Sequence, residues 1–206
     1  MLRRLRGAID WSIFHWLNSA TRGNDAGQDA AEIFNTYAIV VVVAVAAGLW
    51  LLARPGGPLR LKLATASAAL SAVVGLIANI VLSKAWYHDR PFVTHPKQTV
   101  LLIHHAPDNG FPSEHATVAF AIAFGVLVFL PRLGILLGLF AGMIALDRIF
   151  VGVHYPADIV ASFLVGLGSA LLVGVLGRPY LTWAVRMISR VTDPVIVAVR
   201  RPLTRS

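Results

Sequence analysis

Five apolar runs without a charged residue dominate the pattern of hydrophobic and polar positions along the chain, at 36–53, 63–82, 116–131, 133–146 and 159–176. A helix needs about 20 apolar residues to cross the hydrocarbon core of a bilayer. The third and fourth runs reach this length only if they extend into His115 or into Asp147 and Arg148, so those side chains are expected near one membrane face. The pattern predicts an all-α integral membrane protein, built as a bundle of five transmembrane helices.

The first 32 residues follow a different pattern. Their basic start resembles a signal peptide, but Asp10, His15 and Asn18 interrupt the apolar part, and no clear small-residue cleavage site follows. Aromatic residues, among them Trp11 and Phe14, spread over much of a short helix, which is typical of a segment lying in the membrane interface. We expect an N-terminal interfacial helix and loop that anchor the chain. A sixth crossing, or a role in gating access to a site, is the alternative.

Composition agrees with a membrane-embedded chain. Hydrophobic residues make up 57% of it and charged residues 14%, and the mean hydropathy of +0.71 excludes a single soluble core. The absence of cysteine excludes disulfides, thiolate metal sites and thiol catalysis. The net charge of +8 lies largely in loops and in the segment after Gly177. Because the chain carries no nucleic-acid-binding motif, anionic lipid headgroups are the expected partner of this charge and no nucleic acid is expected.

The positive residues indicate how the bundle is oriented. They lie between the first and second runs, between the third and fourth, and after the fifth: Arg54, Arg60, Lys62, Arg132, Arg178, Arg186, Arg190, Arg200, Arg201 and Arg205. Short connections rich in Lys and Arg face the cytoplasm. Loops 83–114 and 147–158 are therefore expected together on the opposite face, and 178–206 as a flexible basic cytoplasmic tail.

Three polar clusters lie in these two loops, at 84–91 (KAWYHDRP), 112–115 (PSEH) and 148–158 (RIFVGVHYPAD). In the third cluster His154 and Asp158 are four residues apart, and they share a face if the backbone is helical there. A carboxylate at that spacing can hold one imidazole nitrogen and leave the other free to attack. The alternative is an interfacial histidine beside a carboxylate that merely favours a helix N-terminus.

Other residues of the clusters are suited to bind an anion. Arg148 ends a short apolar helix, where an unpaired cation is unfavourable, so phosphate is its expected partner and Asp147 the alternative one. Ser113 is placed as the N-cap of the third helix, whose free N–H groups form an anion site, although a plain cap is the alternative. His115, which follows in that helix, can protonate an oxygen held there.

Lys84 and Arg90 lie on the face where positive charge is otherwise scarce, which favours a bound anion over a topology signal. The remaining histidines of the first long loop lack the spacing of a metal site. They are expected as solvated residues or as contacts to a second phosphate: His88, His95, His104 and His105.

Together the clusters resemble the three-part signature of the type 2 phosphatidic acid phosphatase (PAP2) superfamily of membrane lipid phosphatases. That signature is a lysine, a spacer and Arg-Pro, then Pro-Ser-x-His, then an arginine, five residues, a histidine, three residues and an aspartate. The second and third parts match without gaps. The first differs, because five residues separate Lys84 from Arg90 where six are common, and Asp147 stands where a serine often precedes the arginine.

The resemblance implies a PAP2-like core and a role for each matched residue. His154 would attack phosphorus and form a phosphohistidine, Asp158 would hold its ring, and His115 would serve as acid and then base. The phosphate oxygens would be bound, without a metal ion or cofactor, by Lys84, Arg90, Ser113 and Arg148. One membrane-embedded domain over 1–206 is then expected, with the interfacial helix and loop at 1–32, the catalytic core at 33–177 and the basic tail at 178–206.

Within the superfamily, residues 89–92 (DRPF) and 112–117 (PSEHAT) are most similar to the bacitracin-resistance-type undecaprenyl diphosphate phosphatases. This resemblance implies hydrolysis of undecaprenyl diphosphate to the monophosphate, which recycles the lipid carrier of cell-wall synthesis. It implies a multi-pass protein of the bacterial cytoplasmic membrane with its site on the external, periplasmic face. The alternatives are a phosphatase for phosphatidylglycerol phosphate, phosphatidic acid or lipid A, and a non-catalytic binder or transporter of lipid phosphates.

Overall fold

The computed structural model describes residues 2–53, 55 and 57–200, and these form helices without a β-strand among them. The helices are α1 (Leu2–Ser19), α2 (Asp25–Leu52), α3 (Leu59–Ala85), α4 (Pro91–Thr94), α5 (Glu114–Leu127), α6 (Pro131–Phe150), α7 (Pro156–Ala170), its π-helical continuation η1 (Leu171–Leu176), and α8 (Arg178–Arg200). The predicted all-α fold is confirmed. Arg54 and the end of the predicted tail, 201–206 with Arg201 and Arg205, lie outside the described residues.

Helix α5 is the centre of the bundle and packs against α2, α3, α6 and α7. Small residues permit this. A Cβ atom on Gly125 would lie 2.7 Å from the Cα of Ala68 in α3, and one on Gly166 of α7 would lie 2.7 Å from the Cβ of Phe120. Close backbone approach through small residues is how helices associate in membranes, where burial of apolar surface gives little driving force.

Among the described residues, four helical segments are long and apolar enough to cross a membrane: α2, α3, α6 and α7 with η1. The third predicted span is α5, which has only 14 residues. Since four helices surround it, α5 contacts little lipid, and its length need not equal the thickness of the hydrocarbon core. The first predicted span is also longer than its apolar run, because α2 begins at Asp25 with a polar turn that Asn24 caps.

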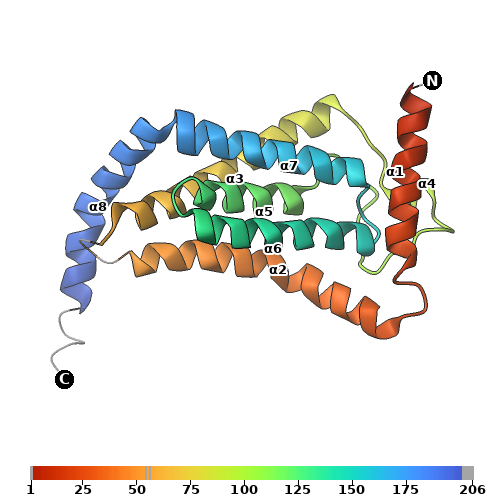
Figure 1. Ribbon diagram of the computed structural model, residues 1–206, viewed down its shortest axis with the longest axis horizontal. Helices are drawn as coiled ribbons and strands as arrows, with labels where there is room; N and C mark the ends of the chain where they lie inside the picture. The colour runs from red at the N-terminus through yellow and green to blue at the C-terminus, as the bar shows by residue number, and fades with distance from the viewer. Residues whose placement is uncertain (1, 54, 56, 201–206) are drawn as a thin grey trace.

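The two ends of the bundle differ, as Figure 1 shows: α1 lies across one end, together with the long loop before α5, and α8 lies at the other. Helix α1 is attached to α6 and α7 through Phe14, which is fully buried against Ile149 and Tyr155. The Asn18 amide donates to the carbonyls of Val100 and Phe150, 2.8 Å away in each case. The predicted N-terminal helix is therefore present and covers the bundle end where the polar clusters lie.

Residues 178–200, expected as part of a flexible tail, instead form α8. The difference has a physical reason. Leu181 and Val185 are buried against α3 and the end of α5. Lys62, expected in a loop, lies in the first turns of α3, and its ammonium donates to both carboxylate oxygens of Asp193 at 2.8 Å. An apolar stripe and a largely buried ion pair together hold α8 on the bundle.

Candidate active site

The connection between α6 and α7 turns sharply and buries His154. Gly152 has a φ of +87°, and a Cβ there would lie 2.4 Å from the Val100 carbonyl oxygen, so glycine is required for both conformation and space. After this turn the backbone N–H of His154 donates to the Arg148 carbonyl at 3.2 Å. His154 itself is only 3% exposed. The turn thus folds the third predicted cluster back on itself.

Hydrogen-bond partners of the His154 ring define its tautomer. Nδ1 lies 2.9 Å from the Gly110 carbonyl oxygen and 3.5 Å from Oδ2 of Asp158. Because both partners only accept hydrogen bonds, Nδ1 carries the hydrogen. Nε2 lies 3.1 Å from Nη1 of Arg90, which only donates, so Nε2 presents a lone pair. Burial lowers the pKa of His154 to about 4, and the ring is neutral near pH 7. Nε2 can therefore act as a nucleophile.

Asp158 contacts two histidines, only one of which the sequence analysis connected with it. The carboxylate is fully buried in the first turn of α7, and Oδ2 accepts the backbone N–H of Tyr155 at 2.9 Å. Oδ1 lies 2.8 Å from Nδ1 of His88, a closer contact than the one to His154. The Gly110 carbonyl, rather than Asp158, makes the shorter contact with the His154 ring. His88 is therefore a partner of Asp158 and not a fully solvated loop residue.

The guanidinium of Arg90 is held on three sides. Nε donates to Oδ1 of Asp108 at 2.7 Å, Nη1 to the Val153 carbonyl at 3.0 Å, and Nη2 to the Asn109 carbonyl at 3.3 Å. The residue is 5% exposed. A planar cation fixed in this way beside Nε2 of His154 is oriented before any ligand arrives.

Arg148 and Ser113 each keep a buried polar atom without a partner among the described residues, Nε and Oγ respectively. Arg148 is 2% exposed near the end of α6, and its Nη1 donates to Oδ1 of Asn35 in α2. Ser113 is the N-cap of α5, as predicted, but its hydroxyl makes no capping bond. Buried polar groups are rarely left unsatisfied. The oxygens of an anion would satisfy both atoms.

A serine of α7 fixes the backbone at the start of α5. The hydroxyl of Ser162 lies 2.9 Å from the Ser113 carbonyl and 2.8 Å from that of Asp158. On the other side, Asn79 of α3 donates to the Pro112 carbonyl at 3.4 Å and accepts from the Thr117 hydroxyl at 3.1 Å. The N-terminus of α5 is thereby held beside the start of α7.

The structure places the other two predicted residues less tightly. His115 is half-buried in the first turn of α5, and burial, followed by the charges of Arg148 and Arg90, lowers its pKa to about 4. Lys84 is exposed at the end of α3, and no described side chain or backbone group pairs with it. No contact among the described residues therefore joins Lys84 to the cluster, and Lys84 is the residue whose spacing departs from the PAP2 signature.

Sequence reasoning missed two asparagines that organise the site. Oδ1 of Asn109 accepts the backbone N–H groups of His88 and Phe111, both at 3.0 Å, and its amide donates to the carbonyls of Ser83 and Trp86. Asn109 lies in an Asp-Asn-Gly sequence, which is typical of a turn, and this was the signal that could have identified it. Asn35, the partner of Arg148, precedes the first apolar run and gave no comparable signal.

Comparisons with known proteins agree with this geometry. Residues 61–179 match the sequence profile of the PAP2 superfamily. The chain belongs to the PAP2 superfamily. The matched segment runs from α3 to the start of α8 and contains all seven residues singled out from the sequence. The predicted resemblance is thereby confirmed at the level of the family.

Two curated relatives of this PAP2 protein are similar over most of their length. Undecaprenyl-diphosphatase BcrC of Bacillus subtilis is 28% identical over 192 residues, which cover 90% of this chain and 94% of the relative. The putative undecaprenyl-diphosphatase YbjG of Escherichia coli is 35% identical over 164 residues, covering 77% and 78%. Among solved structures, the crystal structure of Aquifex aeolicus LpxE superposes with a TM-score of 0.62 at 21% identity, covering 79% of this chain and 92% of that one. The last comparison shows a shared fold.

Proposed function

We propose that this PAP2 protein is a membrane lipid phosphatase that hydrolyses undecaprenyl diphosphate to undecaprenyl phosphate and inorganic phosphate, which recycles the cell-wall lipid carrier. The observation that carries the proposal is His154, a buried neutral imidazole whose Nδ1 is held by acceptors and whose Nε2 lies 3.1 Å from Arg90. The substrate class comes from the two relatives that are named undecaprenyl-diphosphatases.

In the first step, the Nε2 lone pair of His154 forms a bond to the terminal phosphorus. The bond from that phosphorus to the bridging oxygen breaks and its electron pair passes to the oxygen. His115, whose protonated form the bound anionic diphosphate stabilises, gives that oxygen its proton. Undecaprenyl phosphate leaves. Asp158, 3.5 Å from Nδ1, stabilises the positive charge that the ring acquires.

In the second step, water attacks the phosphohistidine. Neutral His115 takes a proton from the water as its oxygen bonds to phosphorus, and the electron pair of the N–P bond returns to Nε2 of His154. Inorganic phosphate leaves and His115 is again protonated. One water is consumed for each diphosphate, and the proposed steps use no metal ion or cofactor.

Charge on the transferred phosphoryl group is stabilised by groups fixed in advance. Arg90 and Arg148 are buried and oriented, and the free atoms of Arg148 and Ser113 are suited to the equatorial oxygens. Electrostatic stabilisation of this kind is a main source of catalysis in phosphoryl transfer. We include Lys84, exposed at the end of α3, as the outermost cation of the set.

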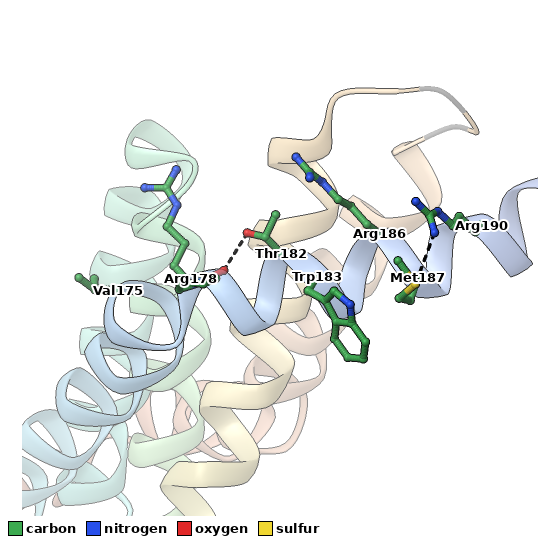
Figure 2. A pocket seen from close by; sticks show the side chains of 8 residues that line it. Val175, Arg178, Thr182, Trp183, Arg186, Met187 and Arg190 are labelled. Atoms are coloured by element: carbon green, nitrogen blue, oxygen red, sulfur yellow. Dashed lines mark hydrogen bonds between the residues drawn. The ribbon is translucent and has the colours of Figure 1, made fainter.

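The opposite end of the bundle supports the proposed orientation, with the active site on the external, periplasmic face of the bacterial cytoplasmic membrane. Arg178, Arg186 and Arg190 line a cavity of about 660 Å³ on α8, together with Trp183 (Figure 2). None of these arginines forms an ion pair with a carboxylate that the structure describes. A basic cavity beside an interfacial aromatic side chain suits anionic phospholipid headgroups of the cytoplasmic leaflet.

Phosphate release by the detergent-purified protein, in excess chelator, tests the function. Undecaprenyl diphosphate is compared with phosphatidylglycerol phosphate, phosphatidic acid and lipid A. Rapid release selective for the polyprenyl substrate is expected. Release from only one of the other lipids would keep the site and replace the substrate. No release from any of them would favour a lipid-phosphate binder or transporter.

A further inference from the structure

His88 is a histidine at the site that the proposed reaction does not use. Its Nδ1 lies 2.8 Å from Oδ1 of Asp158, and the side chain is 34% exposed while that of Asp158 is 1% exposed. Since a carboxylate only accepts, His88 donates this hydrogen bond through Nδ1. A buried carboxylate is stabilised by such a bond, so His88 contributes to keeping Asp158 ionised.

The backbone fixes His88 in place. Its N–H donates to the side chain of Asn109 at 3.0 Å, and its carbonyl accepts the N–H of Gly110 at 2.9 Å. The carbonyl of the same glycine accepts from His154. Gly110 is packed closely here, because a Cβ on it would lie 3.1 Å from Arg90 and 3.3 Å from the His88 carbonyl. His88 and His154 are thus joined twice, through one glycine and through one carboxylate.

We propose that His88 is a positioning residue, which holds Oδ1 of Asp158 so that Oδ2 faces the His154 ring. When His88 itself becomes protonated, it weakens the stabilisation that Asp158 gives to the positive charge on the His154 ring. The inference rests on the proposed function. It extends that function by a third histidine, 66 positions before the nucleophile in the chain, that acts through Asp158 and touches no substrate.

Protonation matters because one carboxylate serves two rings. When His154 attacks phosphorus its ring becomes positive, and Asp158 then stabilises it most if His88 is neutral. A positive charge on His88 neutralises part of the carboxylate's charge and opposes a second cation nearby. The proposed rate therefore falls as the pH falls through the pKa of His88.

The surroundings of His88 raise its pKa above 6.5. The hydrogen bond to Asp158 has the largest effect, burial opposes it, and the charges of Asp158, of Asp10 on α1 and of neighbouring Asp89 raise the pKa further. The Tyr155 ring, whose centroid is 5.1 Å from that of His88, faces it from the start of α7. The acid limb that His88 adds to the rate profile is therefore expected above pH 6.5.

Two substitutions separate positioning from simple packing. In His88→Asn the amide nitrogen can take the place of Nδ1 and donate to Asp158 without titrating. His88→Ala removes the donor. The matched control is His104→Ala, which changes an exposed histidine of the same loop. Folding of each variant is checked by its elution as a single species and by its melting temperature.

Steady-state kinetics with undecaprenyl diphosphate between pH 5 and pH 9 give the first measurement. His88→Ala is expected to lower kcat about 10- to 100-fold, the value of one hydrogen bond to a charged group, with KM little changed. His88→Asn is expected to keep kcat within about threefold of the unsubstituted protein at pH 8 and to lose the limb assigned to His88. An unchanged kcat in a folded His88→Ala protein, or an unchanged acid limb in His88→Asn, would overturn the inference.

A nuclear magnetic resonance titration of ¹⁵N-histidine-labelled protein gives a measurement that does not depend on turnover. The His88 resonance, assigned by its absence in His88→Asn, is expected to titrate above pH 6.5 and to move to lower pH in Asp158→Asn. The same titration midpoint in both proteins would overturn the inference. Failure of the proposed function looks different: the unsubstituted protein would then release no phosphate, whatever the titration shows.

Discussion

The two ends of the bundle both carry arginines, but they hold them in opposite ways. At the site, Arg90 and Arg148 are 5% and 2% exposed, and each is bound by side chains from other parts of the chain. On α8, Arg186 and Arg190 are exposed and form no ion pair with a described carboxylate. One end fixes its cations before a ligand arrives, and the other displays them to solvent.

This difference predicts different kinds of binding. Burying a guanidinium is costly unless partners and a ligand compensate it, so the site end is suited to one phosphate in one geometry. Exposed arginines act through charge alone, and salt screens them over about 10 Å at 0.1 M. The site end is therefore expected to respond strongly to single substitutions and weakly to salt, and the α8 end to do the reverse.

The largest effect is expected from His154→Ala, which removes the proposed nucleophile. Phosphate release should fall at least about 10⁴-fold, as for other covalent catalysts that lose the attacking atom. Asp158→Asn should leave a small residual activity, because the Gly110 carbonyl still holds the His154 ring at 2.9 Å. Single-turnover assays of both variants check this against His104→Ala. A fully active His154→Ala protein would contradict the mechanism.

Arg148→Lys sharpens the comparison between the two ends, because the charge is kept and the geometry is lost. A lysine cannot hold Asn35 and also present a planar fork to phosphate, so kcat/KM is expected to fall about 10²- to 10³-fold. The matched substitution on α8, Arg186→Lys, should leave kcat/KM within about twofold. Both ratios are measured at 0.1 M and 0.5 M salt. Equal losses in the two variants would remove the distinction drawn above.

The sequence predicted what short-range periodicity determines. The apolar runs predicted the bundle. The four-residue spacing of His154 and Asp158 predicted that the two side chains meet, and they lie 3.5 Å apart, but His154 precedes α7 and the backbone there is extended rather than helical. Alternating topology also brought Arg90 and Arg148 to the same end. These inferences need only helix geometry and the bilayer as solvent.

Contacts between side chains far apart in the sequence could not be predicted. His88 reaches Asp158 across 70 positions, and Asn35 reaches Arg148 across 113. Neither pair shares an element or a spacing rule. Lys84 shows the same limit, because a change of one residue at a helix end turns a side chain by about 100°. For 178–200, the arginines led to the prediction of a flexible tail. The apolar residues between them, which are buried against α3, were not recognised as one face of a helix.

The smallest effect on activity is expected from Arg186→Gln combined with Arg190→Gln, which leaves Arg178 and its contact with Phe129 in place. Phosphatidylglycerol in mixed micelles should raise the melting temperature of the unsubstituted protein more than phosphatidylcholine does. The double variant should lose much of that difference, since each arginine near an anionic surface contributes about 1 kcal/mol. Arg22→Gln with Lys97→Gln, an equal charge change outside α8, is the control. Loss of the lipid effect in 1 M salt would support screening of exposed charge, whereas an equal loss in the control would show that net charge rather than the α8 cavity is responsible.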